Sequence, residues 1–403
     1  MGKEAVASRP AGEQLYSRQG RAEKVLIGIH LRSSAVECFV AMIRNFGCRR
    51  LVLRVSIPAS LTTQRKTEAA PGDVPRPCPV CGGSDFTLHW LKGQLRIVRC
   101  RACGMVYADP MPAGMASGEF YDAAGKDYYL SPAKLESDYA DMRFERELRL
   151  FRKSCPRGAV LDVGCSSGAF LFQLHKRWPG DYHILGTDVS GAPLDYAESR
   201  GVPVARGNFL ELDFDSRNKP TPDPSPEGSV ARSFVPLQGG VKGGFGGKGK
   251  FDAVTFWAVI EHLAEPKRFL QHAGALLKPG GLCFVLVPNL ESLAVRLLGA
   301  RYRYIYPQHL NYFTAQTLRR LMEPHFSIVE LRTTHFNPII IWQDFRHQGR
   351  EVSNTERAEL LKRTTGYKQS AALKPVSVLY RASEKLLGAL RLADNLVAVL
   401  QKR

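Results

Sequence analysis

Two pairs of cysteines are spaced as metal ligands. Each pair has the pattern C-x-x-C, and eighteen residues separate the first pair from the second. A turn of this kind presents two sulfurs together, and zinc binds four thiolates tetrahedrally. We therefore predict a zinc site, in preference to a lost or redox-active site, with four ligands: Cys78, Cys81, Cys100 and Cys103. The metal could stabilise a small module that has no core of its own, or it could contact a substrate.

A glycine turn at residues 160–168 could bind a ligand through its backbone. The sequence VLDVGCSSG runs from an apolar, strand-like segment into a helical one. Glycine lets the backbone approach a ligand closely, and the N-terminus of the following helix exposes unpaired N–H groups. Gly164 and Gly168 are four residues apart, so the G-x-G-x-x-G fingerprint of dinucleotide binding is absent. Asp162, two residues before the first glycine, suits a cationic ligand better than a pyrophosphate.

A second carboxylate follows the next strand pattern. Residues 183–188 read HILGTD and end in Asp188, twenty-four residues after Gly164. A carboxylate at the end of the second strand is placed to accept both ribose hydroxyls of an adenosine. Capping of the following helix is the alternative role, and Ser190 could take it. Together with the glycine turn, Asp188 favours a cationic adenosine ligand, and S-adenosylmethionine carries both a sulfonium and an ammonium group.

The elements that must position these residues alternate between strand and helix. Residues 159–163 read as a fully buried strand, and strand and helix patterns alternate from there to about residue 331. This alternation predicts the α/β class, with a doubly wound, Rossmann-like parallel sheet and helices on both faces. Around the cysteines, residues 86–90 and 95–99 predict a hairpin joined at Lys92-Gly93.

The chain divides into five parts by composition. We expect, in order, an extension of unclear structure (1–75), the zinc ribbon (76–110), a helical connector (111–155), the doubly wound domain (156–345) and a C-terminal helical extension (346–403). Residues 215–250 contain 13 Pro or Gly among 36 positions, which predicts a disordered surface insertion. The amphipathic segment Val376–Val399 should pack on the parent domain as a helix, although a basic helix can also lie on a membrane.

Charge and hydropathy restrict the partners. The net charge of +18 over 403 residues makes nucleic acid a possible partner, but no run of five or six like charges is present. No stretch of eighteen apolar residues exists, so we expect no transmembrane segment. The first residues lack the apolar core of a signal peptide, and the five cysteines outside the two pairs are scattered singly. We therefore expect a cytoplasmic protein with reduced thiols.

These motifs resemble those of the class I S-adenosylmethionine-dependent methyltransferases. The resemblance is nearer to the bacterial group in which a cysteine-rich ribbon precedes a catalytic domain similar to ubiquinone-biosynthesis methylases. It covers about residues 78–331, interrupted by the insertion, and rests on an ordered series of motifs: CGMVYADP, LDVGCSSG, GTDVS, FDAVTFWAVIEHLAEP, LLKPGG, VPN and HLNYFTAQTLRRLMEPHF. The ending ADNLVAVLQK is similar as well. None of these motifs identifies the methyl acceptor.

The resemblance implies roles for particular residues. The methionine end of the methyl donor would be lined by four residues of the glycine turn: Asp162, Gly164, Ser166 and Gly168. Cys165 stands in the same turn, where glycine or alanine is common. Asp188 would hold the ribose and Val189 would contact the adenine, with Asn208 and Phe209 after the third strand, where an Asp is often found. The end of the fourth strand, from Trp257 to Glu261, would form the floor of the pocket.

Methyl transfer requires alignment of the two substrates and, for an oxygen or nitrogen acceptor, removal of a proton. His262, which follows Glu261, and His309, on a segment expected to cover the pocket, are the candidate bases. Each could instead be a structural histidine bonded to backbone. We expect the acceptor to be a small molecule, a glycan or a lipid precursor. An RNA methylase that uses the ribbon and the basic surface, and a binding module without turnover, are the alternatives.

Overall fold

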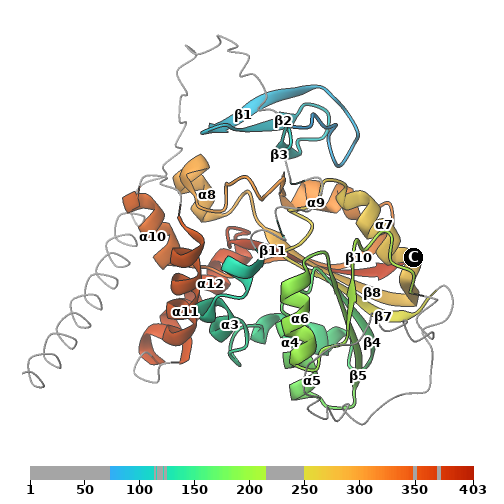
Figure 1. The fold of residues 1–403 in the computed structure, drawn as a ribbon. Helices are drawn as coiled ribbons and strands as arrows, with labels where there is room; N and C mark the ends of the chain where they lie inside the picture. The colour runs from blue at the N-terminus through green and yellow to red at the C-terminus, as the bar shows by residue number, and fades with distance from the viewer. Residues whose placement is uncertain are drawn as a thin grey trace, which may run out of the picture. The chain divides into compact units, whose positions relative to one another are not determined.

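A seven-stranded sheet forms the centre of the fold, in the order β10-β11-β8-β7-β4-β5-β6 (Figure 1). Its strands are β4 (Gly158–Val163), β5 (Tyr182–Asp188), β6 (Val204–Arg206), β7 (Phe251–Trp257), β8 (Leu277–Pro288), β10 (Phe326–Thr334) and β11 (Asn395–Lys402). All neighbouring strands from β6 to β8 are parallel, and β11 is antiparallel to both of its neighbours. The chain builds outward from β4 in both directions, and ligands bind at such a switch point in α/β sheets.

The computed structural model describes residues 73–112, 115, 121, 125–214, 249–347, 352–369 and 374–403. All of these except Pro338–Ile340 belong to one compact unit. The N-terminal extension predicted for residues 1–75 lies outside the described residues up to position 72. The insertion predicted for residues 215–250 lies outside them up to position 248.

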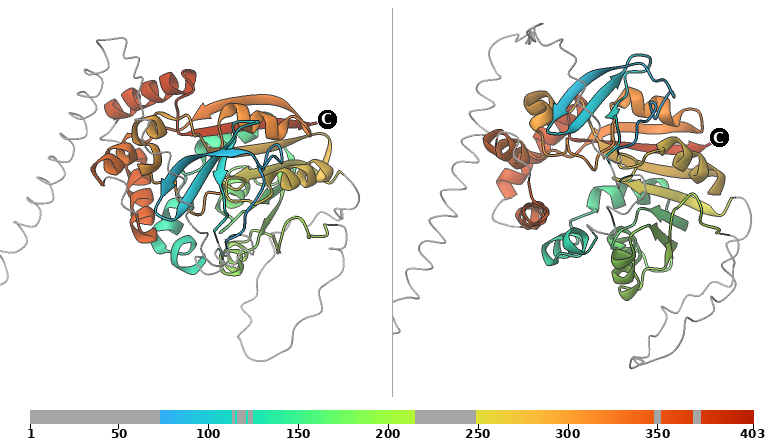
Figure 2. Two further views of the ribbon diagram at one scale, coloured as in Figure 1. Left: turned by 90° about the horizontal axis from the view of Figure 1, so that it is seen from above. Right: turned by 45° about the horizontal axis from the view of Figure 1, so that its top comes forward.

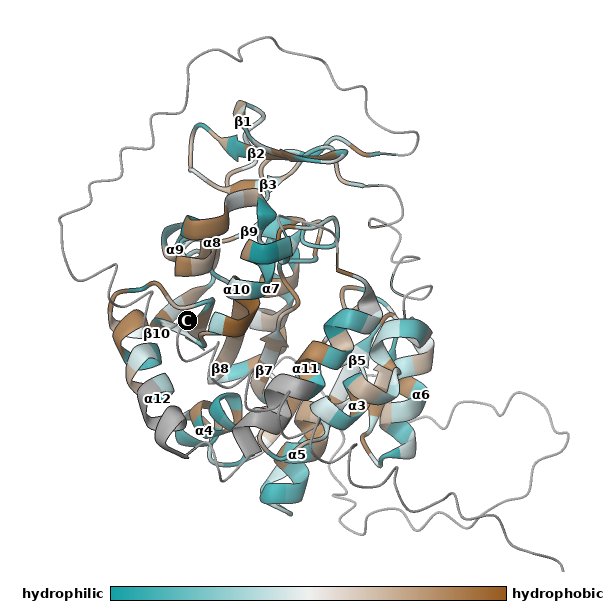
Figure 3. Ribbon diagram, turned by 90° about the vertical axis from the view of Figure 1, so that its left-hand side faces the viewer, coloured by the Kyte–Doolittle hydropathy of each residue, from teal (hydrophilic) through white to brown (hydrophobic). Residues whose placement is uncertain are grey.

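Helices cover both faces of the large sheet (Figure 2). The helices that pack on it are α4 (Glu145–Ser154), α5 (Ala169–Arg177), α6 (Gly191–Ser199), α7 (Pro266–Leu276) and α9 (Ala315–Met322). On one face, Phe151 of α4 packs against both Phe170 of α5 and Phe284 of β8. On the other face, Leu270 of α7 and Leu318 of α9 belong to a second apolar cluster. Figure 3 shows hydrophilic residues on the outward turns of α5 and α6.

A second, four-stranded sheet has the order β1-β2-β3-β9, and Cys100 of the second cysteine pair lies in it, at the end of β2. Its strands are β1 (Phe86–Lys92), β2 (Leu95–Cys100), β3 (Val106–Ala108) and β9 (Asn311–Tyr312). The predicted hairpin is confirmed, with Lys92 paired to Leu95 across the turn. The fourth strand, β9, comes from a part of the chain about two hundred residues further on, and Cys78 and Tyr107 share one apolar cluster with Phe256 of the large sheet. The cysteine module, defined here as residues 73–110, is therefore continuous with the larger domain.

The C-terminal part differs from the predicted helical extension. Helix α12 (Lys374–Ala389) ends before the predicted boundary at Val399, and β11 takes the last residues into the middle of the large sheet. The run LVAVL at 396–400 is buried throughout because β11 has neighbours on both sides and helices on both faces. A short continuous apolar run of this kind fits a buried strand as well as one face of a helix, which explains the error.

The remaining helical elements are η1 (Gly125–Tyr129), α3 (Pro132–Asp138), α8 (Leu293–Leu298), η2 (Gly299–Arg301), α10 (Pro338–His347) and α11 (Asn354–Gln369). Within the described ranges, no helix is both long and apolar enough to cross a membrane.

Candidate functional site

The predicted ligand-binding residues follow the carboxyl ends of four neighbouring parallel strands. Gly164–Gly168 follow β4, Asp188-Val189 end β5, Asn208 follows β6 and Ala258–His262 follow β7. Because these strands are parallel, their carboxyl ends meet at one edge of the sheet. The structure therefore brings together segments that are up to about a hundred residues apart in the sequence.

The glycine turn requires unusual backbone angles. Gly164, Ser166 and Gly168 have positive φ values of 71°, 50° and 73°. A Cβ atom on Gly164 would lie 2.7 Å from Cγ2 of Val259, so both the angle and the close approach demand glycine there. Ser166 adopts the left-handed region despite its side chain, a strain that is typical of functional turns.

Asp188 connects the glycine turn to the end of β5. Its Oδ2 atom accepts the backbone N–H of Ser166 at 2.9 Å, and its Oδ1 atom accepts that of Ser190 at 3.0 Å. Ser190 makes no side-chain cap, and its hydroxyl donates instead to the backbone oxygen of Tyr121. These two bonds hold the orientation of the Asp188 carboxylate, whose oxygens can only accept hydrogen bonds when the group is ionised.

Asp162 lies beneath the turn. Its carboxyl group is buried and accepts the Thr255 hydroxyl at 2.5 Å. The pKa of Asp162 is raised to about 7, chiefly by burial, with the Thr255 hydrogen bond opposing the rise and the negative charge of Asp188 adding to it. Cys165 is buried in the same layer against Gly186, and burial holds the pKa of its thiol well above the usual value. The Cys165 side chain therefore fills space as a neutral thiol.

Three residues that were predicted to contact the ligand have side chains that pack or bond within the protein. The Phe209 ring is buried in the core against Phe256 and Phe269, so this side chain does not line the edge of the sheet. Asn208 uses its amide oxygen to accept the N–H of Leu210 at 3.1 Å, which closes a local turn. The indole of Trp257 packs on Phe170 and Phe284 beside the helical layer.

Val189 remains 45% exposed directly after Asp188. It is therefore available to a flat ligand beside that carboxylate.

The two candidate bases lie together, although they are 47 positions apart in the sequence. The rings of His262 and His309 are 4.7 Å apart between centroids. His262 Nε2 lies 4.0 Å from Oε1 of Glu261, and one ligand atom of each residue lies within 4.8 Å of the others. These three side chains could share one proton or one metal ion. Ala258, with a φ of 58°, allows β7 to turn sharply into this cluster.

Burial makes the cluster electrically neutral. It lowers the pKa of His262 to about 4 and that of His309 well below the usual range, whereas it raises the pKa of Glu261 to about 8. Neither carboxyl oxygen of Glu261 has a hydrogen-bond partner among the described residues, and the same holds for Nδ1 of His309. His262 Nδ1 lies 2.8 Å from the Gln308 carbonyl oxygen. Since that oxygen can only accept, Nδ1 carries the proton and Nε2 presents a lone pair.

Tyrosines surround the histidines. Tyr121 meets His262 edge-on at 6.0 Å, and Tyr306 and Tyr304 lie 4.5 and 6.1 Å from His309. Burial raises the pKa of all three phenols, so each keeps its proton at neutral pH. The surroundings of the two histidines therefore consist of aromatic rings and neutral phenol groups.

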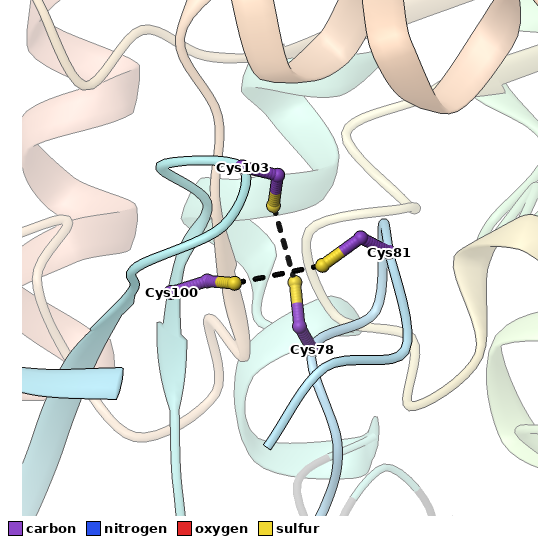
Figure 4. Close-up of side chains that lie close together, drawn as sticks. All are labelled: Cys78, Cys81, Cys100 and Cys103. Carbon is purple, nitrogen blue, oxygen red and sulfur yellow. Dashed lines mark hydrogen bonds between the residues drawn. The ribbon is translucent and has the colours of Figure 1, made fainter. Parts of the chain in front are cut away.

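The four cysteines converge on one point, with their sulfur atoms turned toward each other (Figure 4). Cys78 Sγ lies 3.4 Å from Cys103 Sγ, and Cys81 Sγ lies 3.5 Å from Cys100 Sγ. Zn–S bonds of ~2.3 Å place tetrahedral sulfurs about 3.8 Å apart, so the arrangement fits zinc after a small expansion. Among the described residues, two groups of His, Cys, Asp or Glu side chains could hold a metal ion: these four cysteines, and Glu261 with His262 and His309.

Three residues that position the site were not singled out from the sequence. Thr255 is the one polar residue inside β7 that bonds to Asp162, and a threonine within the apolar run FDAVTFW could have been a signal. Arg76 and the side chain of Asn311 join the cysteine module to the segment that carries His309. That contact spans 235 positions of the chain, and no local pattern indicates it.

Comparisons with known proteins match the part of the chain that carries these residues. Residues 138–325 match a family model described as a methyltransferase domain. The chain is 46% identical over 202 residues to a ubiquinone biosynthesis O-methyltransferase of Caulobacter vibrioides, which covers 48% of this chain and 69% of that protein. It is 31% identical over 147 residues to the protein of the same name from Cereibacter sphaeroides, which covers 36% of this chain and 47% of that protein.

Proposed function

The chain belongs to the class I S-adenosylmethionine-dependent methyltransferases, and we propose that it transfers the methyl group of S-adenosylmethionine to a small-molecule acceptor. The supporting observation is the arrangement at one sheet edge. A glycine turn tied to Asp188 lies on one side, and the buried Glu261–His262–His309 cluster lies on the other. The matched relatives are named O-methyltransferases, which favours a hydroxyl acceptor over a nitrogen or carbon atom.

The donor side suits a cation that carries a ribose. Asp188 is held by two backbone N–H groups, and its carboxylate is the acceptor that would bind the ribose hydroxyls. Asp162 lies below the turn with a raised pKa, and a nearby sulfonium or ammonium group would favour its charged form. Gly164, Ser166 and Gly168 would follow the methionine part with their backbone, and Val189 would contact the adenine beside Asn208. When bound, the donor supplies a methyl group that is already activated by its positive sulfur.

The acceptor side would orient the hydroxyl group and hold its proton. Nε2 of His262 has the lone pair that can take this proton, because Nδ1 is committed to the Gln308 carbonyl. The imidazolium would be stabilised by Glu261, whose carboxyl group loses its own proton more easily when a cation enters the site. His309 and the tyrosines enclose the cluster and would exclude water. Replacement of either histidine by alanine should lower turnover and leave donor affinity nearly intact.

Zinc is the metal that the four sulfurs suit best. Cys78, Cys81, Cys100 and Cys103 provide four ligands, and the cluster sits at the junction of the module with the large domain. We assign it a structural role, because the sulfurs fill all four positions that zinc prefers and leave none for a substrate.

Transfer of radiolabelled methyl from S-adenosylmethionine into fractionated cell extract tests the function. The wild-type protein should label one fraction of small metabolites, glycans or lipids, and Asp188→Ala should label none. Label in RNA, with strong dependence on salt, would replace the small-molecule proposal with the RNA alternative. Donor binding without label in any fraction would favour a binding module without turnover. No donor binding would refute the proposal.

A further inference from the structure

We propose that Arg76 is a positioning residue for the acceptor side of the site and that it acts through Asn311. The inference rests on the proposed function, and it concerns residues 299–313, which we name the covering segment. This segment carries Tyr304, Tyr306 and His309. Its two ends are held by the cysteine module, which gives that module a part in the arrangement of the catalytic cluster.

Arg76 reaches from the module to the catalytic part of the chain. Its Nη2 atom donates to Oδ1 of Asn311 at 2.5 Å and lies 3.5 Å from the Leu310 carbonyl oxygen. Its Nη1 atom lies 3.5 Å from the Ala264 carbonyl oxygen. Burial lowers the pKa of Arg76 to about 10, so the guanidinium remains charged at neutral pH.

The module holds Arg76 at its own end. The backbone N–H of Arg76 donates to Oδ1 of Asp109 at 2.9 Å, and the guanidinium lies over the Tyr107 ring at 5.4 Å. Asp109 is also bonded to Arg96 of β2. Arg76 is therefore held at both ends, by the cysteine module and by Asn311. It can thus fix the place of Asn311 relative to the module.

Asn311 is hydrogen-bonded in turn to residues 260–263, the turn that carries Glu261 and His262. Its Nδ2 atom donates to the carbonyl oxygens of Ile260 and Leu263 at 2.9 and 2.7 Å, and its backbone N–H donates to the Glu261 carbonyl at 2.9 Å. Only one orientation of the amide satisfies this set, because Arg76 can only donate and the two carbonyls can only accept. Asn311 thus binds the turn at three points around Glu261 and His262.

Two further ties hold the covering segment. Strand β9 pairs with β3 through Tyr312 and Val106, and the Ala108 N–H donates to the Leu310 carbonyl at 2.9 Å. Toward the other end, Nζ of Lys92 donates to the Ile305 carbonyl at 2.7 Å and lies 3.4 Å from the Tyr302 carbonyl oxygen. Tyr304, Tyr306 and His309 lie between Tyr302 and Leu310 in the chain.

The donor side has other supports. The glycine turn and Asp188 are held by Thr187, Ser166 and Ser190. Loss of the Arg76–Asn311 contact should therefore misplace the acceptor and its base while the donor still binds. A displacement of about 1 Å at a reacting group can lower the rate by about 100-fold.

Arg76→Gln in the full chain tests the inference. We expect the affinity for S-adenosylhomocysteine to stay within about twofold and amide exchange in residues 302–313 to rise at least tenfold. Methyl transfer into the labelled fraction should fall by about 100-fold. Arg76→Lys keeps the charge and one donor, so it should recover at least a tenth of the wild-type rate. The matched control is Arg101→Gln, an exposed arginine of the same module that pairs with Asp85 and should change nothing.

A second variant keeps the inference testable if Arg76→Gln does not fold. Asn311→Ser breaks the same contact from the other side, and the double variant should be no worse than the more damaged single one, because both act through one hydrogen-bond chain. Additive losses, unchanged exchange in residues 302–313, or a parallel loss of S-adenosylhomocysteine affinity would overturn the inference. If the wild-type protein binds no S-adenosylhomocysteine, the proposed function fails instead, and the exchange measurement still tests whether Arg76 holds the covering segment.

Discussion

Replacement of Asp188 by asparagine separates the two tasks that we assign to its carboxylate. In the folded protein each oxygen accepts one backbone N–H, from Ser166 or from Ser190. With donor bound, the same oxygens would accept the two ribose hydroxyls. Asparagine keeps the shape of the side chain but removes the charge and turns one acceptor into a donor.

The expected loss of affinity follows from these bonds. A hydrogen bond to a charged group contributes about 1.5–3 kcal/mol, and asparagine retains one neutral bond to a hydroxyl. The net loss is therefore about 2–4 kcal/mol, which corresponds to a rise in the Kd for S-adenosylhomocysteine of roughly 30- to 1000-fold. The amide nitrogen would also face a backbone N–H, so the free energy of unfolding should fall by about 1–3 kcal/mol.

Titration calorimetry with S-adenosylhomocysteine measures the first quantity and urea unfolding the second. Asp195→Asn is the matched control, since Asp195 of the neighbouring helix α6 forms an exposed ion pair with Arg206 at the end of β6. Such a pair contributes about 0–1 kcal/mol, and the control should bind within about twofold of the wild type. A folded Asp188→Asn protein that binds as tightly as the control would refute the assignment of the ribose to Asp188.

Three further changes test other parts of the site. Gly164→Ala should lower the free energy of unfolding, measured in urea, by about 1–3 kcal/mol. Adding Val259→Ala should recover only the part of this loss that comes from the 2.7 Å contact, because the positive φ of residue 164 remains. Full recovery would contradict the role of φ. Cys81→Ser should reduce the bound zinc well below one atom per chain by elemental analysis and lower the melting temperature, and unchanged zinc would place the metal elsewhere. The raised pKa of Asp162, about 7 against a usual 3.8, means that its neutral form favours the folded state. The free energy of unfolding should therefore fall as pH rises from about 4 to 7, by up to about 1.4 kcal/mol per pH unit, and Asp162→Asn should remove this dependence; equal slopes for the two proteins would contradict the burial argument.

The parts of the fold with strong local patterns could be predicted from the sequence. The strands at 158–163 and 182–188 were predicted from their strand-like patterns, and the hairpin between the cysteine pairs from two strand candidates joined at Lys92-Gly93. Strand β11 was missed because its apolar run follows a helix with little punctuation, so the two elements read as one amphipathic segment. What makes residues 395–402 a strand is the open edge of β8, which lies more than a hundred residues earlier in the chain.

The site was predictable where residues follow strand ends and not where it depends on packing. Asp188 and the Glu261-His262 pair lie at the sheet edge as the alternation of strands and helices indicated. Phe209 was assigned from its place next to Asn208, but the turn directs its ring into the core. The link from Arg76 to Asn311 depends on how two sheets meet, which neither local sequence expresses.

A crystal structure of the protein with S-adenosylhomocysteine tests the central claim most directly. We expect the ribose hydroxyls on the Asp188 carboxylate, the methionine part along Gly164–Gly168, and the sulfur facing the space beside Glu261, His262 and His309. Cofactor density at another edge of the sheet, or at this edge with Asp188 uncontacted and the sulfur turned away from the histidines, would contradict the account.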